Sequence, residues 1–136
     1  MKFRASFCDP FKPDIIEMGD IPEETIIDRF EKIPWSNLLK EMEGKTDDEI
    51  HFSPSLEIEN KENSNGLSIS AVGDPYNIEF YIFYKRPKLV KILFGLSTRM
   101  NDNYTTDIKG QTKKDVLDCL KALLKNDLAY LENKIK

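Results

Sequence analysis

Hydrophobic and polar residues alternate most regularly between residues 76 and 97, in the sequence Y-N-I-E-F-Y-I-F-Y-K-R-P-K-L-V-K-I-L-F-G-L-S. Every second residue is apolar on both sides of a basic segment at residues 85–88. This period is typical of strands, and β-branched and aromatic side chains suit a pleated surface. The pattern predicts two long strands joined by a tight basic turn at 85–88. Their shared apolar face would carry Ile78, Phe80, Ile82, Tyr84, Val90, Ile92, Phe94 and Leu96.

Shorter alternating segments lie before this pair, at residues 51–60 and 67–71, and Asn65-Gly66 between them is a strong hairpin signal. After the pair, residues 99–111 are polar, with a short edge strand expected at 104–108 at most. The sequence therefore predicts an antiparallel meander of four to five strands, centred on residues 50–98.

Helical spacing of apolar residues appears in two regions. Residues 20–44 predict a helical hairpin that starts at Asp20, is interrupted at Pro34 and stops at Gly44. Residues 112–134 predict one long helix, with Thr112 and Asp115 spaced for a capping box.

Residues 1–19 contain prolines at positions 10 and 13 and predict an extended arm laid over the domain. A sheet with one apolar face must bury it against another layer. We therefore expect one α+β domain over residues 1–136, with N-terminal helices, the meander, and the C-terminal helix packed on the sheet.

Composition adds constraints on location and partners. No apolar run has the length of a signal peptide or of a membrane span, and Cys8 and Cys119 are far apart in the sequence. These features predict a cytoplasmic protein with reduced thiols and no membrane association. The net charge of −4 is unevenly distributed: residues 14–62 carry a net −10 and residues 85–136 a net +6. The acidic half favours a basic protein partner over nucleic acid.

Residues with catalytic potential are few. His51 is the only histidine, and neither cysteine lies in a nucleophile motif. Two cysteines and one histidine far apart do not form a zinc site. Glu57 and Glu59 fall on one strand face and would suit an acid–base pair, but a solvated strand face shows the same pattern. We therefore predict no catalytic, cofactor or metal site. The basic segment 85–88 would contact an anion or simply keep the end of the sheet soluble.

The second face of the predicted sheet carries Tyr81 and Phe83 at its centre. Either the N-terminal helices cover these rings, or the rings belong to a contact surface for another protein. In the second case acidic side chains surround the aromatic centre. The candidate partner-binding residues are Asp47, Asp48, Glu49, Glu57, Glu59, Tyr81 and Phe83.

These properties predict a non-enzymatic protein-binding domain. In type, the chain resembles small acidic bacterial immunity proteins, which are single-domain inhibitors of basic toxins, although no residue motif carries this likeness. The likeness implies an immunity-type inhibitor of a basic partner. The alternatives are an adaptor similar to secretion or assembly chaperones, for which a homodimer is compatible, and a small enzyme that uses carboxylates.

Overall fold

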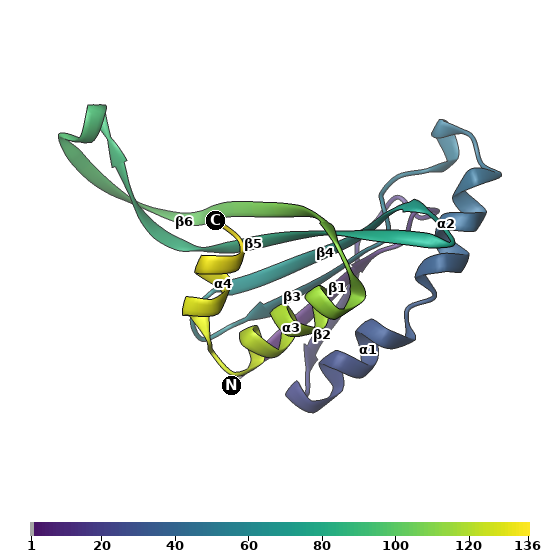
Figure 1. Ribbon diagram of the computed structural model, residues 1–136, viewed down its shortest axis with the longest axis horizontal. Coiled ribbons are helices and arrows are strands. Elements are labelled where there is room, and N and C mark those ends of the chain that lie inside the picture. The colour runs from purple at the N-terminus through teal and green to yellow at the C-terminus, as the bar shows by residue number, and fades with distance from the viewer. Residues whose placement is uncertain (1) are drawn as a thin grey trace.

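The computed structural model describes residues 2–136 as an α+β fold in which one antiparallel sheet carries helices α1–α4 on a single face (Figure 1). The six strands lie in the order β2-β1-β3-β4-β5-β6, and every neighbouring pair is antiparallel. The strands are β1 (Phe3–Cys8), β2 (Ile16–Ile21), β3 (Ser55–Asn60), β4 (Asn65–Asp74), β5 (Asn77–Ile92) and β6 (Ser97–Gln111).

The helices fall into an N-terminal and a C-terminal pair, with three short 3-10 turns elsewhere. The α-helices are α1 (Ile26–Lys32), α2 (Trp35–Glu43), α3 (Lys113–Leu124) and α4 (Leu128–Lys134). The 3-10 turns are η1 (Glu23–Thr25), η2 (Asp47–Glu49) and η3 (Leu93–Gly95). The expected break at Pro34 and stop at Gly44 are present, whereas Asp20 lies in β2 and binds Lys61 instead of capping a helix.

An aromatic cluster fixes the N-terminal helices to the core face of the sheet. The ring centroids of Phe30 and Trp35 each lie 5.6 Å from that of Phe80. The indole Nε1–H of Trp35 donates a hydrogen bond to the carbonyl of Phe30, so this polar group is satisfied inside the core. Each such aromatic pair contributes about 0.5–1.5 kcal/mol beyond the area it buries.

The predicted turn at residues 85–88 is wrong, because β5 continues through this segment to Ile92. Pro87 has no amide to donate to the ladder, and the strand accommodates it at a register shift where Asp102 and Asn103 lie opposite this single residue. The chain reverses instead at η3, where Gly95 has a φ of 87°. Strand β6, which pairs with β5, is therefore fifteen residues long and is not the short edge strand expected at 104–108.

The N-terminal segment is part of the sheet and not an arm laid over it. Strand β1 lies between β2 and β3, and Phe3 is fully buried. The sequence did not reveal β2, because an exposed edge strand lacks an apolar face. A register shift between β1 and β2 further blurs its alternation, close to Gly19 with a φ of 69°.

The long C-terminal helix is in fact two helices. Thr112 and Asp115 form the predicted capping box at the start of α3. The helix ends at Leu124, Asn126 takes a left-handed conformation with a φ of 58°, and the Asp127 carboxylate caps α4. This turn redirects the chain, so that both Leu131 and Ile135 are fully buried against the sheet.

Candidate functional site

The sheet face opposite the α-helices is uncovered. Helices α1 and α2 pack on the face of Phe80, and alternation along β5 therefore directs Tyr81 and Phe83 to the other side. Of the two alternatives for these rings, a cover by the N-terminal helices is therefore excluded. We call this surface the open face. Its members include Arg4, Ser6, Glu17, Glu57, Glu59, Ser68, Ser70, Glu79, Tyr81, Phe83, Lys85, Thr105, Asp107 and Lys109.

Tyr81 and Phe83 form a flat aromatic platform on the open face. Their rings are stacked with centroids 4.5 Å apart and an interplanar angle of 3°. Across β4, the rings face the small side chains of Ser70 and Ser68, so the neighbouring strand leaves them partly exposed. The Asp107 carboxylate accepts a hydrogen bond from the Tyr81 phenol and raises its pKa. The phenol is therefore neutral at physiological pH.

A depression of about 620 Å³ lies beside Phe83 on the same face. Its charged lining is mostly paired within the chain: Glu59 lies 2.7 Å from Arg4 Nη2 and 3.4 Å from Lys85 Nζ. The Ser6 hydroxyl donates to Glu57 at 3.2 Å. Half-exposed ion pairs of this kind contribute about 0–1 kcal/mol to stability.

The acidic candidates Asp47, Asp48 and Glu49 lie away from this depression. They form η2, in the connection from α2 to β3, and this connection packs through Ile50 and Ser53 against the end of β4. Hydrogen bonds from Thr46 lower the pKa of Glu49. The structure therefore divides the candidates: Glu57, Glu59, Tyr81 and Phe83 share the open face, and the other three lie at one end of the sheet.

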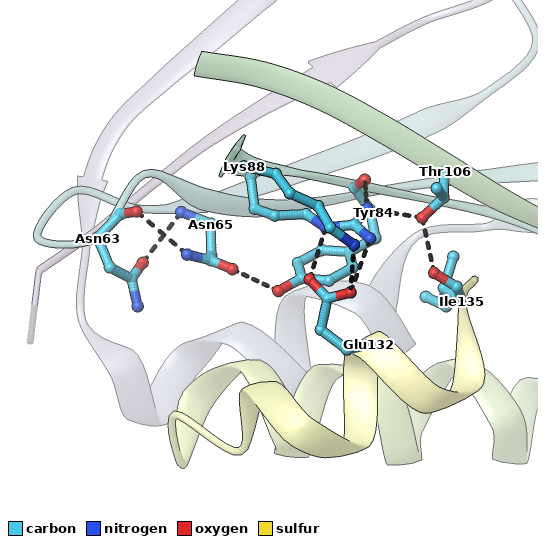
Figure 2. A network of polar contacts seen from close by, with 8 residues as sticks. Asn63, Asn65, Tyr84, Lys88, Thr106, Glu132 and Ile135 are labelled. Carbon is cyan, nitrogen blue, oxygen red and sulfur yellow. Dashed lines mark hydrogen bonds and ion pairs between the residues drawn. The ribbon is translucent and has the colours of Figure 1, made fainter. Parts of the chain in front are cut away.

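The cationic side chains of the basic segment 85–88 form ion pairs within the fold and are not free to bind an anion. Arg86 is only 3% exposed and donates hydrogen bonds to the Glu132 carboxylate, the Tyr84 carbonyl and the Thr106 hydroxyl. These three partners are labelled in Figure 2. Lys88 also reaches Glu132, at 3.4 Å. Burial raises the pKa of the Tyr84 phenol, the next member of this network, to about 12.

Both cysteines are free and buried, and they lie on different sides of the sheet. Cys8 alternates with Phe7 on β1 and lies near Glu57, whereas Cys119 is on α3. Burial raises the pKa of both thiols, that of Cys119 to about 11.

His51 lies just before β3, and its backbone N–H donates to the Pro10 carbonyl. Within residues 2–136, no helix is long and apolar enough to cross a bilayer, and no cluster of three or more potential metal ligands occurs.

The sequence reasoning missed one prominent feature, the projecting end of the β5–β6 hairpin. We call residues 88–101 the arm; it extends beyond the other strands and ends at η3 (Figure 1). Ile92, Phe94 and Leu96 were expected in the core but are exposed, and Phe94 is completely so. Gly95 inside the apolar run 92–96 was the available signal, since glycine favours the left-handed turn found there.

No protein family, curated protein or solved structure matches this chain.

Proposed function

We propose that this chain is a non-enzymatic protein-binding domain and that its open face receives the partner. The observation that carries the proposal is the stacked pair Tyr81 and Phe83 at the centre of a sheet face without a helical cover. Interfaces concentrate binding energy in central aromatic side chains within a polar rim. The carboxylates and cations around the two rings provide such a rim.

The charges around the platform favour a partner with cationic groups. Glu17, Glu57 and Glu79 belong to the open face, and none of them forms an ion pair within the described chain; the acidic turn η2 lies at one end of the sheet. Glu59 contributes less, because Arg4 and Lys85 already neutralise it. An immunity-type inhibitor of a basic protein would use such a surface, and the charges would mainly accelerate association.

The positions of the reactive groups support a binding role over the carboxylate-enzyme alternative. Glu57 and Glu59 are engaged by Ser6, Arg4 and Lys85, and the thiols of Cys8 and Cys119 are buried in their neutral form. The adaptor alternative has its own supporting observation, the exposed apolar arm, because adaptors that assemble with other chains present such surfaces.

Site-specific photocrosslinking tests the proposal in cells that naturally produce the protein. A benzophenone amino acid at position 81 or 83 should yield a covalent protein adduct, identified by mass spectrometry. The same group at position 130, an exposed tyrosine of α4 on the helical side of the sheet, serves as the matched control and should yield none. Absence of any adduct at 81 and 83 would contradict the proposal.

A further inference from the structure

The arm presents an exposed apolar surface that no residue in the described part of the chain, 2–136, covers. Its exposed large apolar side chains are Leu89, Ile92, Leu93, Phe94, Leu96 and Met100. Leu93 and Phe94 both have positive φ values, 51° and 56°, which are unfavourable for residues with a Cβ. The strained turn thus holds Phe94 outward at the very tip. Contiguous apolar surface of this kind marks an interaction site.

The arm is also cationic. Its charged residues are Lys88, Lys91 and Arg99, and no carboxylate occurs between Glu79 and Asp102. Lys88 contacts Glu132, whereas Lys91 and Arg99 form no ion pair with any residue in the described part of the chain. An occupant that suits this arm therefore combines an apolar contact with carboxylates.

The opposite end of the molecule is acidic. Residues 41–49 include five carboxylates and one lysine, and the ion pair of that lysine, Lys45, is with Glu49. This segment lies where β5 begins, and the arm lies where β5 ends, so the two are separated by the length of the longest strand. Figure 1, with the long axis horizontal, shows the arm at one end and the α2–β3 connection at the other.

We infer that the partner of the open face is a second copy of this chain. The two copies pack open face to open face around a two-fold axis that crosses the long axis at a right angle. This operation places each basic arm against the acidic end of the other copy and brings the Tyr81–Phe83 platforms together. The contact is self-complementary, as a two-fold interface must be. The inference rests on the proposed function, because it names the partner for the same surface.

The same arrangement accounts for the charge asymmetry of the chain. The acidic half indicates a basic partner, and the basic element with a fitting apolar tip is the arm of an identical molecule. Asp47 and Asp48 would meet the cationic end of the arm, where Lys91 and Arg99 lie on its two faces. The contact would therefore weaken with rising ionic strength, since exposed charges are screened over about 8 Å at physiological salt.

Sedimentation equilibrium on the full chain tests the inference with a charge swap. We expect a wild-type dimer, weakened at least about tenfold by Lys91→Glu with Arg99→Glu, and equally by Asp47→Lys with Asp48→Lys. All four substitutions in one chain should restore dimerisation, because the swapped arm then meets a swapped acidic end. Phe94→Ser with Leu96→Ser should also weaken the dimer without unfolding the domain, since both side chains are exposed. Tyr130→Ser, a control at an exposed site of α4 on the helical side of the sheet, should have no effect.

A monomeric wild-type chain, or a dimer that none of these arm and acidic-end changes affects, would overturn the inference. Crosslinking from position 81 separates this failure from failure of the proposed function. An adduct of twice the chain mass supports both ideas. An adduct with a different protein overturns the homodimer and leaves the binding function standing, whereas no adduct overturns both.

Discussion

Arg86 and Glu132, which are 46 residues apart, form a bidentate ion pair with Nε–Oε1 and Nη2–Oε2 distances of 2.8 and 2.9 Å. The guanidinium lies over the Tyr84 ring, 4.2 Å from its centroid, and 4.8 Å from that of Tyr104. Arg86 is the point where β5 leaves the body of the sheet to become the arm. The pair therefore anchors the base of the arm to α4. The planar guanidinium of arginine makes this bidentate contact better than the ammonium group of a lysine would.

Glu132→Gln should lower the free energy of unfolding at neutral pH by about 1–3 kcal/mol, because it leaves the buried guanidinium without its countercharge. Glu132 itself is 39% exposed, which keeps the expected loss below that of a fully buried pair. Urea unfolding of wild type and variant measures the loss. Glu62→Gln, at an exposed position, is the control and should change stability by less than about 0.5 kcal/mol.

The Arg86–Glu132 pair also predicts that the free energy of unfolding depends on pH. The hydrogen bonds from Arg86 lower the pKa of Glu132 in the folded state, so the stabilisation is complete above the unfolded pKa of about 4.3. It is lost as the pH falls through the folded pKa. The stability difference between wild type and Glu132→Gln should therefore shrink below about pH 4.3. A difference that stays constant from pH 7 to pH 3 would contradict this role.

Phe80→Ala and Phe83→Ala distinguish the two faces of β5. Phe80 is buried under Phe30 and Trp35, and its loss should cost about 3–5 kcal/mol. Phe83 is half-buried on the open face of the single chain, so in a monomeric background such as Lys91→Glu with Arg99→Glu its loss should remove mainly the stack on Tyr81, about 1 kcal/mol. Chemical denaturation measures both values. Equal costs for the two in that background would mean that the chain itself covers the open face.

Leu120→Ala and Leu124→Ala compare two positions on α3. Leu120 is fully buried, and its replacement should cost about 2–5 kcal/mol because it leaves a cavity. Leu124 is half-buried at the end of the helix, and its truncation should cost distinctly less. Thermal and urea unfolding of both variants check this order, and a reversed order would contradict the packing of α3.

Truncation after Gly110 should abolish cooperative unfolding. The cut removes α3 and α4 and exposes core side chains of β4 and β5 to water, among them Ile69 and Ile82. Calorimetry on the truncated chain tests this expectation. A sharp transition near the wild-type melting temperature would show that the C-terminal helices are dispensable.

The thiols of Cys8 and Cys119 should react slowly with a disulfide reagent in the folded protein and rapidly after denaturation. Burial raises both pKa values, which suppresses the reactive thiolate at pH 8. The sheet between them also prevents a Cys8–Cys119 bond. Cys8→Ser and Cys119→Ser should leave the oligomeric state unchanged. Mass spectrometry that detects the bond in the native protein would contradict the arrangement.

Several elements followed from the sequence because their causes are local. The capping box of Thr112 and Asp115, the break at Pro34 and the stop at Gly44 each depend on backbone groups within a few residues. Alternation likewise placed Glu57, Glu59, Tyr81 and Phe83 on one face of the sheet, because a strand has a period of two. The sequence by itself thus determined the α+β class and which side chains of β3 and of the first half of β5 share a face.

The tertiary structure decided which face is covered and where β5 ends. Both faces of β5 carry large apolar side chains, so periodicity is unable to identify the core face; the packing of Phe30 and Trp35 on Phe80 selects it. Likewise, Pro87 locally favours a turn. Strand β5 nevertheless continues through this residue, because it pairs with the fifteen-residue strand β6 and because Arg86 binds Glu132. These choices depend on contacts between residues far apart in the chain, where burial and cross-strand hydrogen bonds outweigh local preference.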